Sequence, residues 1–461
     1  MIPLHDRLAI VRRFRHLLAD EAVAFAAAAS GLLGSPASEG LIGEVLPLAD
    51  ACLFLEREAA EILAPRRLGS ARRPLWLFGV ELEIRREPLG TVLIIGAYNY
   101  PLLLAGVQTI QALVAGNTVL LKPGRGAGPA AAALASGLAR AGLPPELLTV
   151  LDEDPSAARH AMASGVDKVV LTGSAATGRA VMADLARHGT PSVMELSGCD
   201  ACCVLAGADL DLVSRALAFG LRFKGSATCI APRRVLGRAA TLAALESKLA
   251  EAARAIPPRP VDPETAARVK DLVDDAVAAG ARVAVGRADG GTSMPVIVVA
   301  NARADLPLLT EDLFAPVISF VPVASDDDAV AAVNANPYAL GAAVFGPLDA
   351  ARGIADRLEV GCVIINDVIA PTADPRLPFG GRRASGFGVT RGAEGLLEMT
   401  AVKTVSIRRG RMRQHLEPHE PGDDAIFLAY LRAAHSGAWR VRAAALYALV
   451  RALARRNQVR A

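Results

Sequence analysis

The chain has 461 residues, of which 52% are hydrophobic and 21% charged, so it is long enough for two or three packed domains and too apolar to be disordered. Its net charge of +3 argues against a general attraction to nucleic acid, and no nucleic-acid partner is expected. Six irregularly spaced cysteines do not form the framework of a small secreted protein, and no export signal is evident, so we expect a cytoplasmic protein.

A stretch of 34 residues, 88–121, carries no charged side chain. It is long enough to cross a bilayer, but polar residues and glycines recur along it. We therefore predict a strand at 91–96, a helix at 102–116 and a strand at 118–123, which is the pattern of a parallel sheet buried on both faces.

Strands and helices continue to alternate after this point. The next predicted elements are a helix at 129–142, a strand at 147–153, a helix at 157–165 and strands at 168–174 and 191–196. A second run has predicted strands at 234–238, 282–287, 293–300 and 315–323, with helices at 241–256 and 264–280. The fold class is therefore α/β, with two doubly wound domains that meet near Ser197.

The segment LTGSAATG at 171–178 joins a predicted strand to a predicted helix, with Gly173 and Ser174 at the turn. Free backbone N–H groups at such a helix start can bind an anion. Arg179 follows the segment where a P-loop would have lysine, which argues against nucleotide triphosphate hydrolysis. A dinucleotide pyrophosphate and an ordinary capped helix remain as the two interpretations.

Lys122 ends the predicted strand TVLLKP and is one of only six lysines, against forty-four arginines. The carboxyl end of a buried strand is a suitable place to contact a cofactor hydroxyl or phosphate. A solvated strand terminus is the alternative.

Two spacings could indicate metal ligands. Cys199 and Cys202 have the Cys-x-x-Cys spacing, but no second pair accompanies them, so buried small apolar residues are the better interpretation. His415 and His419 lie four apart with Pro418 between them, which disfavours a regular helical face. We assign no metal site.

Glu195 and Cys229 are the residues best suited to catalysis. Glu195 follows an apolar strand, and burial raises the pKa of a carboxylate toward the range of a general base. Cys229 lies in a loop, KGSATCIAP, where a thiol can be accessible enough to act as a nucleophile. Taken singly, each also suits a structural role.

Together with these residues, ordered motifs resemble those of NAD(P)-dependent aldehyde dehydrogenases, nearest the fatty-aldehyde or class-three branch. The resemblance runs from about residue 5 to 407 and rests on EPLGTVLIIGAYNYP, AGNTVLLKP, LTGS, VMELSG, TCIAPRRV, EDLFAPV, NDVIAPTADPRLPFGG and SGFGVTRGAEGLLEMTAVKTV. It implies that Cys229 is the nucleophile, Glu195 the general base and Asn99 an oxyanion donor. The cofactor contacts that it implies are Lys122, Arg125, Gly173, Ser174, Leu196, Asp312 and Phe314.

The resemblance implies that an aldehyde is oxidised to a carboxylic acid through a thiohemiacetal and a thioester on Cys229, with hydride transfer to NAD or NADP. Glu195 would activate the water that hydrolyses the thioester. Two alternatives stay open: a non-catalytic relative with an assembly or binding role, and an acyl-thioester reductase.

The resemblance also implies a domain organisation and an oligomer. We expect a cofactor-binding domain at 1–74 and 89–197, a catalytic domain at 198–395, and oligomerisation elements at 75–88 and 396–410. These elements would pair subunits of a homodimer or homotetramer. Residues 411–461 would be a basic helical extension.

Four residues depart from the family pattern and put cofactor affinity in question. Arg125 stands where the family has a glutamate on the adenosine ribose, and a cation there suits a 2′-phosphate, which favours NADP. Asp312 replaces a glutamate on the nicotinamide ribose. Ala227 replaces a glutamine, and Cys199 replaces a lysine.

The C-terminal residues must be interpreted from their own pattern. From 425 to 461 there is no acidic residue and there are seven arginines, so this part carries +7 and the other 424 residues carry −4. Trp439, Leu446, Val450 and Leu453 are spaced to form one helical stripe. The stripe predicts a helix that lies on an anionic membrane or, alternatively, packs on the enzyme's acidic body or a neighbouring subunit.

Overall fold

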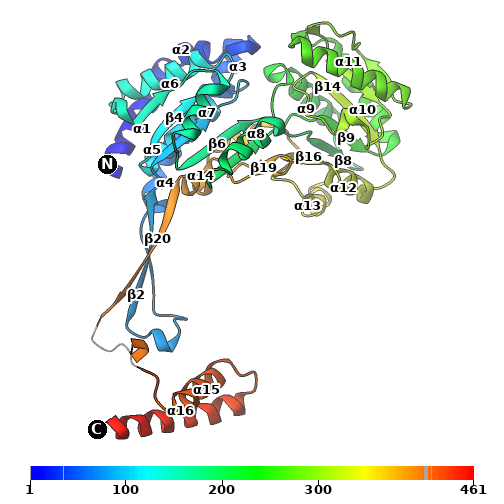
Figure 1. Ribbon diagram of the computed structural model, residues 1–461. Coiled ribbons are helices and arrows are strands. Elements are labelled where there is room, and N and C mark those ends of the chain that lie inside the picture. Colours follow the sequence, from blue (N-terminus) through cyan, green and yellow to red (C-terminus); the bar gives the residue numbers. More distant parts are fainter. Residues whose placement is uncertain (1, 35, 410–413, 417, 461) are drawn as a thin grey trace. The chain divides into compact units, whose positions relative to one another are not determined.

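The computed structural model describes residues 2–34, 36–409, 414–416 and 418–460. The chain forms two compact units (Figure 1): Met1–Arg66 with Glu83–Val405, and Arg67–Leu82 with Ser406–Ala461. Both predicted α/β sheets lie in the larger unit. None of the helices in the described residues is long and apolar enough to span a bilayer.

The first sheet has six strands in the order β19-β7-β6-β3-β4-β5. Their bounds are β3 Thr91–Ile95, β4 Thr118–Lys122, β5 Leu148–Val150, β6 Lys168–Gly173, β7 Ser192–Leu196 and β19 Gly386–Phe387. All pair in parallel except β19, which is antiparallel to β7. The chain runs outward from β3 in one direction and then from β6 in the other, so the carboxyl ends of β3 and β6 flank the switch point at which such sheets bind ligands.

Helices cover both faces of this sheet (Figure 1). One face packs against α1 Leu4–Asp20, α2 Ala22–Ala28, α4 Leu46–Ile62, α5 Leu103–Ala115 and α6 Gly128–Arg140, and the other against α7 Pro155–Ala163 and α8 Ala175–Leu185. Every residue of α5 is buried. The uncharged stretch 88–121 is therefore the core of the domain, as the sequence predicts.

The second sheet has seven strands in the order β11-β13-β14-β9-β8-β16-β17, of which only β11 is antiparallel to its neighbour. Its strands are β8 Ala201–Val204, β9 Arg234–Gly237, β11 Arg282–Val285, β13 Ile297–Ala300, β14 Val317–Pro322, β16 Gly341–Phe345 and β17 Cys362–Ile365. One face packs against α9 Leu210–Arg222 and α10 Ala239–Arg254, and the other against α11 Pro263–Ala278, α12 Asp326–Asn334 and α13 Leu348–Ala355.

The predicted strand at 293–300 is two strands. β12 Ser293–Met294 pairs with β10 Arg259–Pro260 in a separate ribbon, and β13 begins only at Ile297. Pro295 lies between them, and a proline has no N–H to donate to a ladder. Smaller elements complete the unit: α3 Ala37–Gly40, β15 Tyr338–Ala339, β18 Arg382–Arg383 and α14 Gly392–Glu398.

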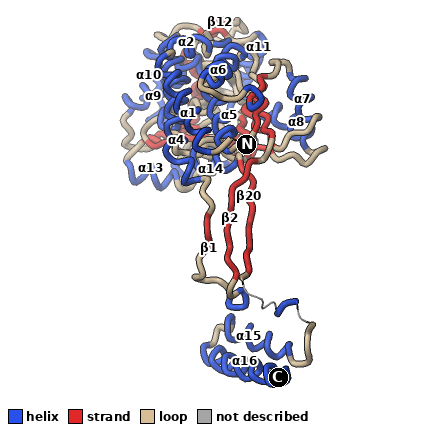
Figure 2. Tube along the Cα trace, turned by 90° about the vertical axis from the view of Figure 1, so that its left-hand side faces the viewer, coloured by secondary structure: helices blue, strands red, loops and turns tan. Residues whose placement is uncertain are grey.

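A three-stranded sheet, β1-β2-β20, is formed by β1 Arg66–Leu68, β2 Val80–Pro88 and β20 Thr400–Arg408 (Figure 2). The smaller unit ends in two helices, α15 Asp423–His435 and α16 Trp439–Arg460, which lie side by side and are joined by three residues. The helix predicted from the C-terminal pattern is thus present as α16.

Candidate active site

The carboxyl edge of the first sheet carries most of the predicted cofactor contacts. Gly173 ends β6, and Ser174 is the N-cap of α8, where its Oγ accepts a hydrogen bond of 3.1 Å from the amide of Thr177. Ser174 is exposed and Gly173 is partly exposed, while Leu196 is buried at the end of β7. The start of α8 is therefore an ordinary capped helix end, which is one of the two interpretations of this segment. It also remains accessible to a ligand.

Lys122 ends β4 and is buried. Burial lowers the pKa of its ammonium, while the nearby carboxylates of Glu153 and Asp154 raise it. The Lys122 ammonium makes no ion pair within the described part of the chain. Such a cation at this edge fits a hydroxyl or phosphate of a dinucleotide.

Arg125 lies in the loop between β4 and α6 and is exposed, with no ion pair among the described residues. The next residues of this loop are held by Glu153, whose two carboxylate oxygens accept 2.6 Å hydrogen bonds from the amides of Gly126 and Gly128. A carboxylate thus occupies the start of α6, close to the position of Arg125.

Cys229 lies in the loop between α9 and β9, where the backbone is unusual. Lys224, Gly225 and Ser226 all have positive φ, at 52°, 62° and 65°. Only glycine adopts this conformation without strain, so the loop needs support from its surroundings.

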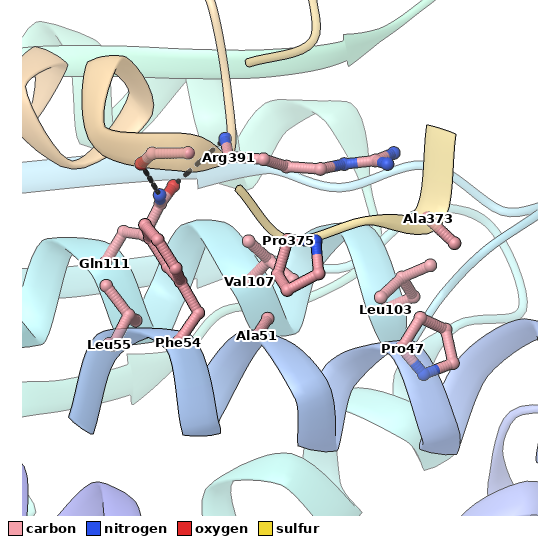
Figure 3. Close-up of a pocket in the computed structure, with 11 residues that line it drawn as sticks. Pro47, Ala51, Phe54, Leu55, Leu103, Val107, Gln111, Ala373, Pro375 and Arg391 are labelled. Carbon is pink, nitrogen blue, oxygen red and sulfur yellow. Dashed lines mark hydrogen bonds between the residues drawn. The ribbon is translucent and has the colours of Figure 1, made fainter. Parts of the chain in front are cut away.

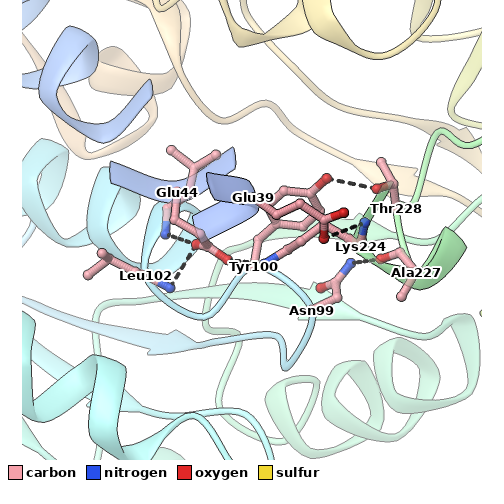
Figure 4. A network of polar contacts seen from close by, with 9 residues as sticks. Glu39, Glu44, Asn99, Tyr100, Leu102, Lys224, Ala227 and Thr228 are labelled. Carbon is pink, nitrogen blue, oxygen red and sulfur yellow. Dashed lines mark hydrogen bonds and ion pairs between the residues drawn. The ribbon is translucent and has the colours of Figure 1, made fainter. Parts of the chain in front are cut away.

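Two hydrogen bonds tie this loop to the residues that follow β3 (Figure 4). The Asn99 side chain donates from Nδ2 to the carbonyl of Ala227 at 2.7 Å, and the hydroxyls of Tyr100 and Thr228 are hydrogen-bonded at 2.7 Å. The first sheet thereby holds the two residues that directly precede Cys229.

Sequence reasoning missed a buried ion pair beside these bonds. Lys224 Nζ lies 2.7 Å from Glu44 Oε1, and both side chains are fully buried (Figure 4). The other oxygen of Glu44 accepts hydrogen bonds from the amides of Leu102 and Leu103 at the start of α5. The two residues are 180 positions apart, and no local pattern links them.

Glu195 is the fourth residue of β7 and is buried. Neither of its carboxylate oxygens has a hydrogen-bond partner in the described structure. Burial raises the pKa of Glu195, and the positive charge of Arg391 opposes this effect. A raised pKa is what the sequence analysis predicted for Glu195, and it suits a general base.

Cys229 is partly exposed and lies in the wall of a cavity of about 210 Å³. Most of the lining is apolar and comes from both lobes of the larger unit: Ile42, Gly43, Pro47, Tyr100, Leu103, Leu104, Phe223, Thr228, Ile230, Ile369, Ala370, Thr372, Ala373, Phe379 and Arg391. Among the described residues that line it, Arg391 is the only charged one. The cavity therefore fits an apolar substrate next to the thiol.

The surroundings of Cys229 do not favour the thiolate that we expected a loop position to allow. Burial raises the pKa of the thiol well above its usual value, and the negative charges of Glu195 and Asp200 raise it further, while Arg391 lowers it. A low-dielectric setting with two neighbouring carboxylates opposes a third negative charge. Formation of the thiolate therefore requires a proton acceptor.

Arg391 was not singled out by the sequence, although it lies in one of the matching motifs. Its guanidinium donates to the carbonyl of Thr372 at 2.7 Å and lies over the ring of Phe379, 4.7 Å from the centroid. Its own amide donates to Oε1 of Gln111 (Figure 3). These contacts hold an arginine against the wall of the cavity that contains Cys229.

Asp312 and Phe314 lie on the loop before β14. One carboxylate oxygen of Asp312 is buried without a hydrogen-bond partner in the described residues, and burial raises its pKa to about 6. Phe314 packs edge-on against Tyr98, with ring centroids 5.8 Å apart. Buried Arg233 donates to the carbonyl of Ala315 at 3.0 Å and braces this loop.

These features are compatible with a dinucleotide. An unpartnered acceptor on Asp312 suits a ribose hydroxyl, the Lys122 ammonium suits a hydroxyl or phosphate, and the start of α8 is open. The residues present therefore fit NAD or NADP.

The cysteines of the Cys-x-x-Cys pair are buried. Cys199 donates to the carbonyl of Leu309 at 3.3 Å, and Cys202 lies inside strand β8, which the sequence analysis did not predict. His415 is exposed, and the ring of His419 lies against Phe427. No group of three or more potential metal ligands occurs in the residues that the structure describes.

Comparison with known proteins identifies relatives along most of the chain. The model of the aldehyde dehydrogenase family matches residues 1–405. A 4,4′-diapolycopene aldehyde oxidase from a Methylomonas species is 30% identical over 84% of this chain and 74% of that protein. A succinate-semialdehyde dehydrogenase [NADP(+)] from Deinococcus radiodurans is 33% identical over 87% of this chain and 86% of that protein. The crystal structure of a Mycobacterium tuberculosis aldehyde dehydrogenase complexed with NAD+ superposes with a TM-score of 0.82 at 26% identity, covering 89% of this chain and 87% of the other.

Proposed function

The chain belongs to the aldehyde dehydrogenase family, and from this premise we propose that it oxidises an aldehyde to a carboxylic acid, with Cys229 as nucleophile and NAD or NADP as hydride acceptor. The observation that carries the proposal is the position of Cys229 in the wall of the apolar cavity, with Glu195 and Arg391 close enough to influence its pKa. A thiol, a base and a cation beside a substrate-sized space are the parts that this reaction needs.

The reaction begins when the Cys229 thiol loses its proton and Sγ bonds to the carbonyl carbon. The proton passes to solvent, which the partly exposed thiol can reach. Bound NAD or NADP supplies a hydride acceptor, which leaves a thioester on Cys229. Water then breaks the carbon–sulfur bond and releases the acid and the thiol.

Asn99 supports the oxyanion. A side-chain amide has two N–H donors, and one of those of Asn99 is used by the carbonyl of Ala227. The second is available to the developing alkoxide, together with the backbone N–H of Cys229. The hydrogen bond to Ala227 also fixes the amide, so that its orientation costs little entropy during the reaction.

Glu195 acts as the general base in hydrolysis of the thioester. It must be ionised to take a proton from the attacking water, and its raised pKa places that ionisation nearer neutral pH than for an ordinary glutamate. Arg391 limits the rise in the pKa of Glu195 and thereby keeps more of this carboxylate ionised.

The cofactor would be held by Lys122, Gly173, Ser174, Leu196, Asp312 and Phe314. We propose that Arg125 tilts the preference toward NADP, because an exposed guanidinium can pair with a 2′-phosphate. Glu153, which lies between β5 and α7 and binds the amides of Gly126 and Gly128 in the loop of Arg125, limits this preference, since a carboxylate repels a phosphate.

The substrate class follows from the cavity. Its apolar lining supports an aldehyde with a sizeable hydrocarbon group, in keeping with the predicted fatty-aldehyde branch. Arg391 favours a second candidate, an aldehyde with a distal carboxylate, because its Nε is buried without a hydrogen-bond partner among the described residues. Comparing kcat/KM for decanal and for succinate semialdehyde separates the two, and Arg391→Met should lower kcat/KM for succinate semialdehyde more than for decanal if Arg391 binds the distal carboxylate.

The function is tested with the purified full chain. Aldehyde and NAD or NADP should yield reduced nicotinamide and acid in equal amounts. Absence of turnover with short, long and aromatic aldehydes would support a non-catalytic relative. Conversion of an acyl thioester to an aldehyde, without acid formation, would support the reductase alternative.

We also propose the domain organisation that the sequence predicts, with cofactor binding by 1–74 and 89–197, catalysis by 198–395 and oligomerisation through 75–88 and 396–410. The strands β2 and β20 support the last assignment, since they are long elements outside the two α/β sheets. A homodimer or homotetramer in the cytoplasm is the assembly that we expect, and the six unpaired cysteines suit a reducing compartment.

A further inference from the structure

The two helices of the smaller unit lie side by side, and Ala445 is the one buried residue among the described side chains of α16. Ala444, Ala445 and Ala448 of α16 line the groove between the helices, together with Ala425 and Ala429 of α15. Small side chains allow the two helices to approach closely. α15 leaves most of the surface of α16 uncovered, since the other described side chains of α16 are exposed or partly exposed.

The surface that α15 leaves uncovered carries the apolar stripe. Its members are exposed by 73% for Trp439, 56% for Leu446, 59% for Val450 and 38% for Leu453. Their spacing of seven, four and three residues places them on one side of the helix, and large apolar residues gathered on one exposed side usually mark an interaction surface.

Exposed arginines border the stripe on both sides. Arg440 and Arg451 lie beside it on one flank, over the rings of Trp439 and Tyr447, and Arg440 also lines the groove toward α15. Arg442 lies on the other flank, where its Nε donates to the carbonyl of Ala433 in α15 at 3.1 Å. None of these three arginines forms an ion pair with a carboxylate in the part of the chain described. The side chains of Arg456 and Arg460 lie outside the described residues.

The charge of this segment decides which partner fits. Residues 425–461 carry seven arginines and no acid. A second copy of α16 would bring the same positive charges together, which is unfavourable. An anionic lipid surface instead offers acceptors for the arginines and an apolar layer for the stripe, with Trp439 at the level of the headgroups.

We propose that α16 lies flat on an anionic lipid surface, with the stripe of Trp439, Leu446, Val450 and Leu453 inserted between headgroups and the flanking arginines bound to lipid phosphates. The contact is peripheral, since α16, like the other helices in the described residues, is not long and apolar enough to span a bilayer. The contact does not depend on the proposed dehydrogenase activity. It would place the enzyme at a lipid surface, from which apolar aldehydes can partition into the active site.

The proposal is tested by flotation of the full chain with vesicles of phosphatidylglycerol and phosphatidylcholine, and with vesicles of phosphatidylcholine alone. We expect binding to the anionic vesicles only, and its loss when ionic strength rises from about 0.05 M to about 0.5 M. Binding to neither vesicle at low salt, or equal binding to both, would overturn the proposal.

Two sets of variants locate the contact. Leu446→Ser with Val450→Ser should weaken binding more than tenfold, and Arg440→Glu or Arg451→Glu should each weaken it about fivefold or more. The matched control is Leu348→Ser, which removes an equally exposed leucine from α13 of the larger unit and should bind normally. Equal loss in the control would contradict the assignment. A change of oligomeric state in the Leu446→Ser and Val450→Ser variant, seen by light scattering without any vesicle binding of the native chain, would assign the stripe to a second copy instead.

Discussion

The ammonium of Lys224 and the carboxylate of Glu44 form a 2.7 Å ion pair from which solvent is completely excluded. Burial raises the pKa of Glu44, and the charge of Lys224 opposes the shift. The pair joins the strained loop before Cys229 to the start of α5, because Glu44 also accepts two amides there. It therefore supports the loop that presents the nucleophile.

Lys224→Met should destabilise the larger unit by about 3 to 5 kcal/mol, because it leaves Glu44 buried without its cation. The double variant Lys224→Met with Glu44→Gln should recover a large part of this loss, since it removes both charges. Urea unfolding of the single and double variants measures the difference. As a control, Lys270→Met removes one partner of an exposed ion pair and should change stability by less than about 1 kcal/mol. Additive effects of the two buried substitutions would contradict the coupling.

Arg391 should set the pH dependence of the reaction. Its positive charge lowers the pKa values of Glu195 and Cys229, so Arg391→Met should raise both. Because the reaction needs the ionised forms of Glu195 and Cys229, the acidic limb of the plot of rate against pH should move to higher pH by about one unit. Arg391→Lys should restore the profile, and Arg376→Met, which affects only an exposed ion pair, should leave it unchanged. Coincident profiles for Arg391→Met and the native chain would show that the charge has no such role.

The positions at the carboxyl edge of the first sheet could be predicted because each lies at the end of a strand that its own residues specify. Lys122 and Gly173 end apolar runs, and Glu195 lies one residue before the end of another. Each run has the pattern of a buried strand, and parallel pairing brings the strand ends to one edge. The β8 strand was missed because its four residues, Ala201–Val204, are too short a run to be distinguished from a loop.

The remaining parts of the site could not be predicted from local patterns. Glu44 reaches Lys224 across 180 residues, and the amide of Arg391 reaches Gln111 across 280. Such contacts depend on how distant segments of the larger unit pack together. The pKa of Cys229 was misjudged for the same reason, since it is raised first by burial and then by carboxylates, and both come from other segments of the chain.

Glu195→Gln should preserve a burst of reduced nicotinamide and slow the steady state by about a hundredfold, because an amide cannot accept a proton from water. Rapid mixing followed by steady-state recording gives both phases. Glu394→Gln, in the first turn of α14, is a control that should behave like the native chain. Loss of the burst together with the steady state would instead place the role of Glu195 before hydride transfer.

Arg125→Glu should lower the affinity for NADP relative to NAD by about tenfold, which corresponds to the weaker end of a charge-assisted contact because Arg125 is exposed. Dissociation constants for both cofactors, measured with the native chain and the variant, give the ratio. Arg179→Glu serves as a control for the general loss of positive charge on this lobe. An unchanged ratio would mean that Arg125 does not contact the 2′-position.

The central claim is that Cys229 is the nucleophile, and the most direct measurement is the rate of aldehyde-dependent cofactor reduction by Cys229→Ser. A serine hydroxyl is far less acidic than a thiol, and the surroundings already oppose ionisation, so the rate should fall about a thousandfold or more with unchanged folding. Cys362→Ser, at the other partly exposed cysteine, should retain the native rate. A Cys229→Ser variant that keeps most of the native rate would contradict the account.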